Sequence, residues 1–431
     1  MNPPLANRIL LACALCTSLF AAGPVRAQAA PLTLAEAVES ARTRLPDLAR
    51  AQATTAAAAA RVDQAFAPLL PQLSTTAGYG LQTGNIAGAP LKADLSNRFS
   101  FGVTASQQVW DFGSTWYRYQ AAGATLQSQK QGEVTALSLA ILGARASFFQ
   151  ARAARALVGV ADENLASQER HLAQVDGFVK AGTRPEIDLA QVRADVANAR
   201  LQRVNARNGY EQAKAVLNQA MGVERSTDYD VADEQLPALS EEEAAEEDLV
   251  AQAVKARPEL RSLEQQATAQ GLTIRSTNGN YWPSLGVSTG LSNAGVDSLA
   301  DTALNWNVGA TLSWSFYTGG STKAQVRELE AGQQSLSAQL SAQRQQIRLE
   351  VVKARLGVVA AKASVEAAEQ ALEATRQRQN LAEARYQAGA GSILELQDAQ
   401  VAVNGSQGQA IQAAFDVSLA RAQLLRALGR D

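Results

Sequence analysis

The segment LNWNVGATLSWSF, residues 304–316, decides the fold class of this chain. Its even positions, from Leu304 to Phe316, carry apolar side chains, and its odd positions carry only Asn, Gly, Thr or Ser. Such an unbroken alternation predicts a β-strand with one apolar and one polar face. Because about 9–11 residues cross a bilayer as a strand, the segment is long enough to span a membrane.

Three further segments show the same pattern. It is clear in residues 99–109 and weaker in residues 73–81 and 285–291. Four strands cannot close a membrane barrel, since the smallest such barrels have about eight, and unpaired strand edges are too costly to leave in hydrocarbon. We therefore expect several copies of the chain to build one shared barrel around a water-filled lumen. A soluble sandwich with one buried face is the alternative explanation.

The tryptophans favour the membrane interpretation. All of them lie in the predicted strands or directly beside them. Membrane barrels concentrate aromatic side chains in girdles at the two membrane–water interfaces. The residues that we expect in these girdles are Trp110, Trp282, Trp306 and Trp314.

The rest of the chain has the composition of long, closely packed helices. Hydrophobic residues make up 46% of the sequence and aromatic residues only 5%, so small side chains such as alanine have to fill the interior. The proline-free segments 113–180 and 320–388 predict two helices, each roughly 100 Å long at about 1.5 Å per residue. From Ile347 to Leu372, apolar residues recur in alternating steps of four and three, which is the pattern of a coiled coil.

The chain consists of two similar halves. Pro46 and Gly182 in the first half correspond to Pro258 and Gly389 in the second, together with the residues around them. Internal similarity of this length indicates a structural repeat. The predicted organisation is a first repeat over residues 28–222, an acidic linker over 223–248 and a second repeat over 249–431.

Each repeat is expected to hold the same order of elements. An opening helix is followed by two strands, a very long helix, a turn and a closing helix. The opening helices are predicted at residues 34–63 and 249–280, and the closing helices at 186–221 and 393–428. We interpret the acidic run in the linker as a solvated segment, because runs of like charge usually face water.

The first 27 residues are predicted to be a signal peptide. Arg8 precedes an apolar stretch at residues 9–22, and small residues around Ala27 resemble a cleavage site. The alternative is a membrane anchor, but the stretch is shorter than the roughly 18–20 residues needed to span a bilayer. Cys13 and Cys16 both lie inside it, so the mature chain is expected to lack cysteine.

Composition excludes several functions. Lys and Arg total 39 and Asp and Glu total 41, so no basic excess points to nucleic acid as a partner. One histidine and no mature cysteine leave little for metal binding or thiol chemistry, and no nucleophile-elbow or phosphate-loop motif is evident. We therefore expect no enzyme activity and no cofactor. The single histidine, His171, lies in a polar stretch and is expected to face solvent.

The order and spacing of these features are familiar. The glycine turns, the Pro-to-strand junctions, Asp111-Phe112-Gly113 and Tyr317-Thr318-Gly319-Gly320 together resemble the TolC family of outer-membrane efflux proteins over the whole mature chain. The resemblance implies a mixed α and β membrane protein of a Gram-negative bacterium: a homotrimer with a twelve-stranded barrel in the outer membrane and a long α-helical tunnel in the periplasm.

The resemblance also implies partners. Such a tunnel docks a periplasmic adaptor (membrane fusion) protein and an inner-membrane transporter of RND, ABC or MFS type, forming a tripartite efflux pump or a type I secretion system. The expected function is an exit duct for small molecules or proteins. A periplasmic coiled-coil scaffold or adaptor without a pore remains the alternative.

The two turns between the long and closing helices are candidates for adaptor contact. In the family these turns meet the adaptor, and a glycine at the start of each turn suits a backbone with positive φ. The candidate residues are Gly182, Thr183, Arg184, Ala388, Gly389, Ala390 and Gly391.

Carboxylates follow the turns and are candidates for a periplasmic gate. In a threefold assembly Asp188, Glu395 and Asp398 would form acidic rings, which favour hydrated cations. The alternative explanation is that they are ordinary helix-start acids, which interact favourably with the amino-terminal dipole. Tyr386 matches a gate tyrosine of the family, whereas Gly391 stands where the family has an arginine and Arg184 occupies the equivalent place in the first repeat. The resemblance therefore implies a rearranged or weaker closing network.

Overall fold

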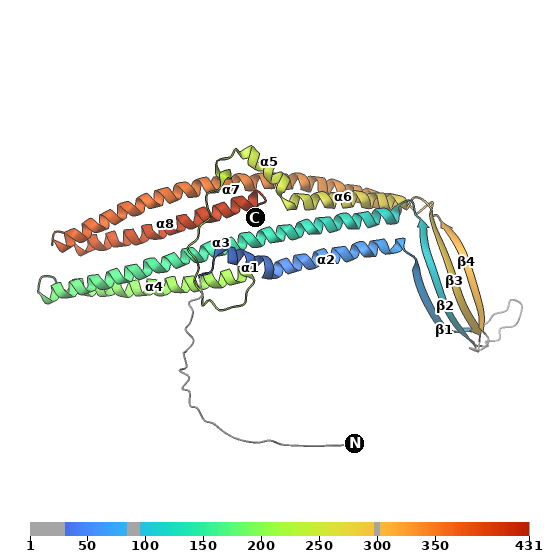
Figure 1. Cartoon of the computed structure of the whole chain (residues 1–431), viewed down its shortest axis with the longest axis horizontal. Coiled ribbons are helices and arrows are strands. Elements are labelled where there is room, and N and C mark those ends of the chain that lie inside the picture. Colours follow the sequence, from blue (N-terminus) through green and yellow to red (C-terminus); the bar gives the residue numbers. More distant parts are fainter. Residues whose placement is uncertain (1–30, 84–94, 297–301, 431) are drawn as a thin grey trace, which may run out of the picture.

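The computed structural model describes residues 31–83, 95–296 and 302–430. The predicted signal peptide, with both cysteines, lies outside these residues. The helices run lengthwise and the strands leave one end of them at an angle (Figure 1). The same order of elements occurs twice. The elements are α1 (Leu34–Arg44), α2 (Pro46–Phe66), β1 (Gln72–Thr83), β2 (Leu95–Trp110), α3 (Ser114–Lys180), α4 (Glu186–Met221), α5 (Glu246–Ala256), α6 (Pro258–Gly279), β3 (Ser284–Val296), β4 (Thr302–Ser313), α7 (Ser321–Gln387) and α8 (Ile393–Ala427).

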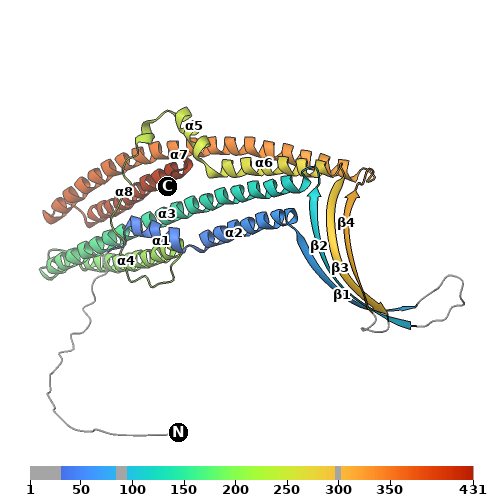
Figure 2. The same ribbon diagram turned by 45° about the vertical axis from the view of Figure 1, so that its right-hand side comes forward.

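The four strands form one antiparallel sheet in the order β1-β2-β3-β4, which curves as it leaves the helices (Figure 2). Its register places Val103 opposite Leu291 and Leu291 opposite Trp306. Because side chains alternate between faces, this register brings the apolar positions of all four strands to the same side. That side is uncovered in the single chain, where Trp306 is 74% exposed.

The fourth strand is shorter at one end than the alternation suggests. β4 ends at Ser313, so Trp314 and Phe316 lie beyond the ladder. The indole N–H of Trp314 instead donates to the carbonyl oxygen of Tyr281 at 3.1 Å. The pattern was therefore right about the face of each residue in the strand and wrong about where the strand ends.

Each opening helix is broken, where the sequence predicted a continuous one. Pro46 begins α2 and Pro258 begins α6, and the residues before them, Leu45 and Arg257, have extended backbones. A proline clashes with a helical residue before it and is well placed in the first turn of a new helix. The predicted single helices at residues 34–63 and 249–280 were therefore wrong.

A glycine at the end of each closing helix fits against each break. Gly222 has φ +67°, and a Cβ atom there would lie 2.7 Å from the backbone of Arg44. Gly429 has φ +72°, and its Cβ would lie 3.0 Å from the Cβ of Ala256. The closing helices can therefore end against the breaks only because these positions have no side chain.

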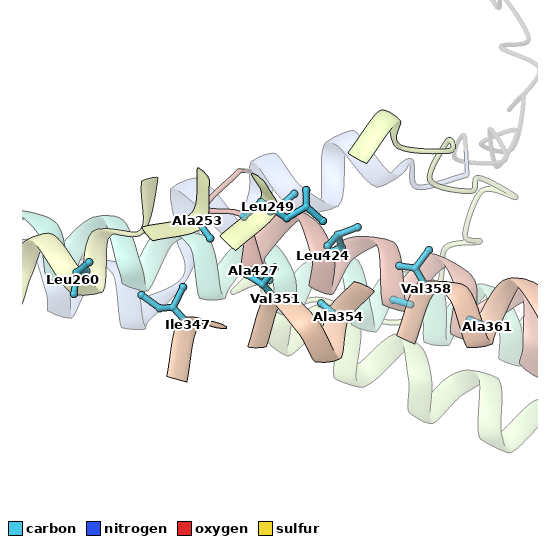
Figure 3. Packing of buried hydrophobic residues seen from close by; sticks show 12 residues of the cluster. Leu249, Ala253, Leu260, Ile347, Val351, Ala354, Val358, Ala361, Leu424 and Ala427 are labelled. Atoms are coloured by element: carbon cyan, nitrogen blue, oxygen red, sulfur yellow. The ribbon is translucent and has the colours of Figure 1, made fainter. Parts of the chain in front are cut away.

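The heptad seam of α7 faces the core, as predicted (Figure 3). Five of its residues are buried in one cluster with side chains from α5, α6 and α8. Beyond this cluster Val365, Ala368 and Leu372 are only half-buried, because α5 and α6 no longer cover them. The buried seam residues are Ile347, Val351, Ala354, Val358 and Ala361.

The acidic run is not simply a solvated linker. Residues Ser240–Glu243 form a short 3-10 helix, η2, in which Glu242 is 7% exposed. Its carboxylate accepts hydrogen bonds from Lys362 of α7 at 2.9 Å and Arg421 of α8 at 2.8 Å. Glu242 therefore fastens the segment between the repeats to the second helical hairpin.

One helix carries an apolar stretch. An 18-residue stretch of α3 has a mean hydropathy of 1.3. By length and composition alone, the helix could therefore cross a membrane. α3 packs along α2, α4 and α6, and 39% of the apolar stretch is buried in these contacts.

Candidate functional site

The α3–α4 turn and the α7–α8 turn lie at the end of the helices opposite the sheet (Figure 1). The two turns have the same local structure. Gly182, after α3, has φ +72°, and Gly389, after α7, has φ +74°. The next residue in each turn donates its N–H back into the preceding helix: Thr183 to the carbonyl of Phe178 at 3.0 Å, and Ala390 to that of Arg385 at 2.9 Å. This is the glycine-ended helix motif, and it reverses the chain within a few residues.

The candidate adaptor-contact residues form the outermost part of these turns. Most of them are exposed, and Arg184 and Gly391 are partly covered. The exposed ones are Gly182, Thr183, Ala388, Gly389 and Ala390.

Tyr386 joins the two hairpins behind the turns. It comes from the last turn of α7, is 2% exposed and packs in one cluster with Val175 of α3 and Val192 of α4. Leu396 and Ala399 of α8 belong to the same cluster. The ring of Tyr386 is therefore buried between the α3–α4 hairpin and the α7–α8 hairpin.

Arg184 and Asp188 approach this ring from the first hairpin. The guanidinium carbon of Arg184 lies 4.8 Å from the ring centroid of Tyr386, which is a cation–π contact. Burial raises the pKa of the Tyr386 phenol, the charge of Arg184 opposes that rise, and the carboxylate of Asp188 adds to it. The phenol oxygen is buried and has no hydrogen-bond partner among the described residues. The structure thus brings together three of the predicted gate residues.

The other two predicted gate residues lie apart from this contact. Glu395 forms an ion pair with Arg385 at 2.7 Å, and its backbone N–H donates to the Ser392 hydroxyl that caps α8. Asp398 is exposed on the next turn of the helix. The carboxylate of Glu395 therefore already has a cationic partner within its own hairpin, while Asp398 is exposed in the single chain.

The sequence interpretation missed two contacts between the hairpins. Gln397 of α8 donates a hydrogen bond to Asp195 of α4. His171, predicted to face solvent, is instead half-buried, with its ring centroid 5.3 Å from that of Tyr386. Its spacing of four residues from Val175 places it on the inner face of α3, and that spacing could have revealed it.

At the sheet end of the rod, aromatic side chains gather where helices meet strands. The ring of Phe112 stacks on Trp282 at 5.2 Å and contacts Trp110 edge-on at 5.9 Å. Trp314 belongs to the same junction through its hydrogen bond to Tyr281. Trp306 lies within β4, away from this junction. The structure therefore gathers three of the four predicted girdle residues at the junction, while Trp306 lies further along the strand.

A family model described as Outer membrane efflux protein matches residues 37–223 and 249–430, which is most of the chain. The chain belongs to the outer membrane efflux protein family. Members of this family are channel proteins, and the chain is accordingly an efflux channel protein of the Gram-negative outer membrane, as the resemblance to TolC implied.

Two named relatives span nearly the whole chain. The pyoverdine export outer membrane protein OpmQ of Pseudomonas aeruginosa is 26% identical over 394 residues, which are 89% of this chain and 82% of that protein. The outer membrane protein TolC of Vibrio cholerae is 25% identical over 405 residues, which are 92% of this chain and 90% of that protein.

Solved channel structures share the fold. CusC aligns over 92% of both chains with a TM-score of 0.78 and 20% identity. The outer-membrane channel OprN covers 92% of this chain and 90% of its own, with a TM-score of 0.79 and 20% identity. The open state of MtrE from Neisseria gonorrhoeae covers 92% and 89%, with a TM-score of 0.75 and 20% identity.

The local fold of the second turn favours a glycine at position 391, where the family pattern has an arginine. A Cβ atom on Gly391 would lie 3.0 Å from the backbone nitrogen of Tyr386 and 3.1 Å from the carbonyl carbon of Arg385. The arginine that the family pattern led us to expect would therefore require the backbone of Arg385 and Tyr386 to shift by a few tenths of an ångström. Arg184, from the first hairpin, supplies the positive charge beside Tyr386 instead.

Proposed function

We propose that three copies of this chain form one channel, in which their sheets close a shared twelve-stranded barrel. The observation that carries the proposal is the register of the sheet, which places the apolar positions of four strands on one uncovered face. Lipid can cover that face, and the opposite face, rich in Ser, Thr, Asn and Gly, can line an aqueous lumen. β1 and β4 each have one pairing edge left over in the described sheet, so β4 of one copy can pair with β1 of the next.

The helical hairpins continue the lumen into the periplasm and end at the turns of Gly182 and Gly389. We propose that these turns receive a periplasmic adaptor, which connects the channel to an inner-membrane transporter of RND, ABC or MFS type. The proposed function is passage of small molecules or secreted proteins without catalysis. A scaffold lacking a pore gives no reason for an exposed apolar face on the sheet.

The gate of this channel is proposed to be the contact around Tyr386. While its ring is buried against Arg184 and the side chains of the first hairpin, the two hairpin tips are held together. Opening then requires Tyr386 to leave its site, which an adaptor can favour by binding better to the separated tips. Asp398 and, to a lesser extent, Glu395 are proposed to set the charge of the passage beside this contact.

The proposal is tested with the purified full-length protein. Native mass spectrometry is expected to give three chains per particle, and insertion into a planar lipid bilayer is expected to give discrete ion conductance. A monomer or dimer that stays in the soluble fraction and conducts no ions would contradict the proposal.

A further inference from the structure

The chain has a single histidine, and the structure places it in the contact that holds the two hairpins together. The imidazole of His171 meets the ring of Tyr386 at an interplanar angle of 63°, with centroids 5.3 Å apart. Its Nε2 atom is buried and accepts or donates no hydrogen bond within the described residues. The guanidinium carbon of Arg184 also lies 4.8 Å from the centroid of the same tyrosine ring.

Charged groups surround the imidazole on several elements. A cavity of about 210 Å³ beside it is lined by the charged Arg170 of α3 and Glu383 of α7 and by the neutral Gln397 of α8. The carboxylate of Asp195 of α4 also acts on the imidazole, and that of Asp188 acts on Tyr386.

The balance of these effects favours the neutral imidazole in the closed contact. Burial lowers the pKa of His171 below its ordinary value, and this outweighs the hydrogen bond with Gln174 and the charges of Glu383 and Asp195. In the closed contact, the imidazole of His171 therefore binds a proton less readily than it would in water.

We propose that His171 is an acid-sensitive wedge in the contact: when its imidazole takes up a proton, the two hairpin tips separate more readily. The inference rests on the proposed function in one respect, namely that separated tips correspond to a conducting channel. It goes beyond that function because it makes the resting state of the tip depend on periplasmic pH without any adaptor.

The physical reason is the difference in hydration between the two states. A protonated imidazole carries two N–H donors, and its buried Nε2 has no hydrogen-bond partner among the described residues. Protonation also puts a second cation near the ring that already bears Arg184. When the hairpins part, water can solvate the imidazolium, so the separated state binds the proton better.

The sign of the pH effect follows by linkage. Because the pKa is lower in the closed state than in the separated state, lowering the pH through the ordinary histidine range shifts the population toward separation. The effect starts near the ordinary pKa of about 6.5 and is complete below the lowered value. In a trimer, three such protonations act on the same opening.

The experiment records single channels of the purified full-length protein in planar bilayers at about pH 7.5 and about pH 5.5, on either side of that ordinary pKa. The wild type is expected to spend several-fold more time in its high-conductance state at the lower pH. His171→Gln keeps a polar side chain that does not titrate, and its open time is expected to change little with pH.

Two further variants make the test specific. The double variant H171Q/A173H keeps one histidine but moves it to an exposed position of α3, and it is expected to behave like H171Q. Val175 is fully buried in the Tyr386 cluster, so maleimide should label V175C faster at the lower pH, relative to the exposed A173C. The mature chain is expected to offer no other cysteine to the label.

The possible outcomes distinguish failure of the proposed role of His171 from failure of the proposed channel function. An acid response of the same size in H171Q, a regained response in H171Q/A173H, or closure of the wild type at the lower pH would overturn the wedge. Absence of conductance at every pH would instead contradict the proposed function.

Discussion

Arg385 Nη1 lies 2.7 Å from Glu395 Oε1, across the turn that joins α7 to α8. The pair links the two helices of one hairpin, and both side chains remain partly exposed. Exposed pairs of this kind contribute only about 0–1 kcal/mol to stability. The pair therefore matters for the charge of the proposed passage. The charge of Glu395 is balanced by Arg385, whereas no ion pair balances Asp398 among the described residues.

We predict that the carboxylates at the tip contribute unequally to cation selectivity. Asp398→Asn should lower the selectivity more than Glu395→Gln, because Arg385 already offsets the charge of Glu395. Arg385→Gln should raise it by releasing that charge. Reversal potentials in a KCl gradient measure all three effects, and Arg378→Gln, on an exposed part of the same helix, is the control. Equal losses for the two acidic variants would show that the pairing has no influence.

The two faces of β4 should respond differently to a charge. Val308 lies on the apolar face and Asn307 on the polar face of the same strand. Val308→Lys should cost up to about 2–4 kcal/mol if lipid covers its face, and should reduce the amount of trimer in the outer-membrane fraction several-fold. Asn307→Lys is the matched control and should assemble nearly normally. Similar yields of the two variants would exclude a lipid-facing apolar side.

The break between α5 and α6 is fastened by a buried arginine. Arg257 is 2% exposed, pairs with Glu350 of α7 and with Glu259 at 3.3 Å, and donates to the carbonyl of Arg426 at 3.2 Å. Arg257→Gln leaves Glu350 and Glu259 only their longer ion pairs with Arg426, at 3.8 and 3.6 Å. We therefore expect a loss of about 3 kcal/mol in unfolding free energy, at the lower end of the range for a broken buried pair. Denaturant midpoints measure it. The exposed Arg348 of α7 gives the control R348Q, and an equal, small shift for both variants would contradict this role.

The same network predicts how stability depends on pH. Burial tends to raise the pKa of Glu350, but the hydrogen bond from Gln346 and the charge of Arg257 outweigh burial and lower it from the ordinary 4.5. A carboxyl with a lowered pKa stabilises the fold above the unfolded value and loses that contribution as the pH falls through the folded value.

Unfolding midpoints measured from neutral pH down to below 4.5 should therefore drop in the wild type. Glu350→Gln should be less stable at neutral pH and should lose less on acidification. A variant that is as stable as the wild type at neutral pH and falls just as steeply would contradict the prediction.

Much of the fold could be predicted from sequence because its elements have strict periods. The alternation around Trp306 predicted a strand with one apolar and one polar face, and the seam from Ile347 predicted the core face of α7. The breaks at Pro46 and Pro258 were missed because the helical pattern continues on both sides of each proline, although proline disfavours a helical residue before it. The end of β4 was missed because Trp314 continues the alternation after the hydrogen-bonded ladder has ended.

The candidate site was harder to predict because its contacts join helices that are far apart in sequence. Tyr386 and Arg184 could be named singly, but their cation–π contact depends on how two hairpins pack. His171 was misjudged because its immediate neighbours are polar, whereas burial follows the face of the helix. Glu242 was misjudged because its neighbours in sequence are acidic, whereas its cationic partners come from the distant helices α7 and α8.

α3 and α7 contain 67 residues each, while α4 and α8 contain 36 and 35. Both hairpins reach the same end of the molecule (Figure 1). Inserting a single residue into one long helix would turn everything beyond it by about 100° and advance it by about 1.5 Å, which would misalign the two tips. Only whole heptads added to all four helices keep seams and tips aligned. The length of the helical part of this protein can therefore change only in steps of one heptad, which is roughly 10 Å.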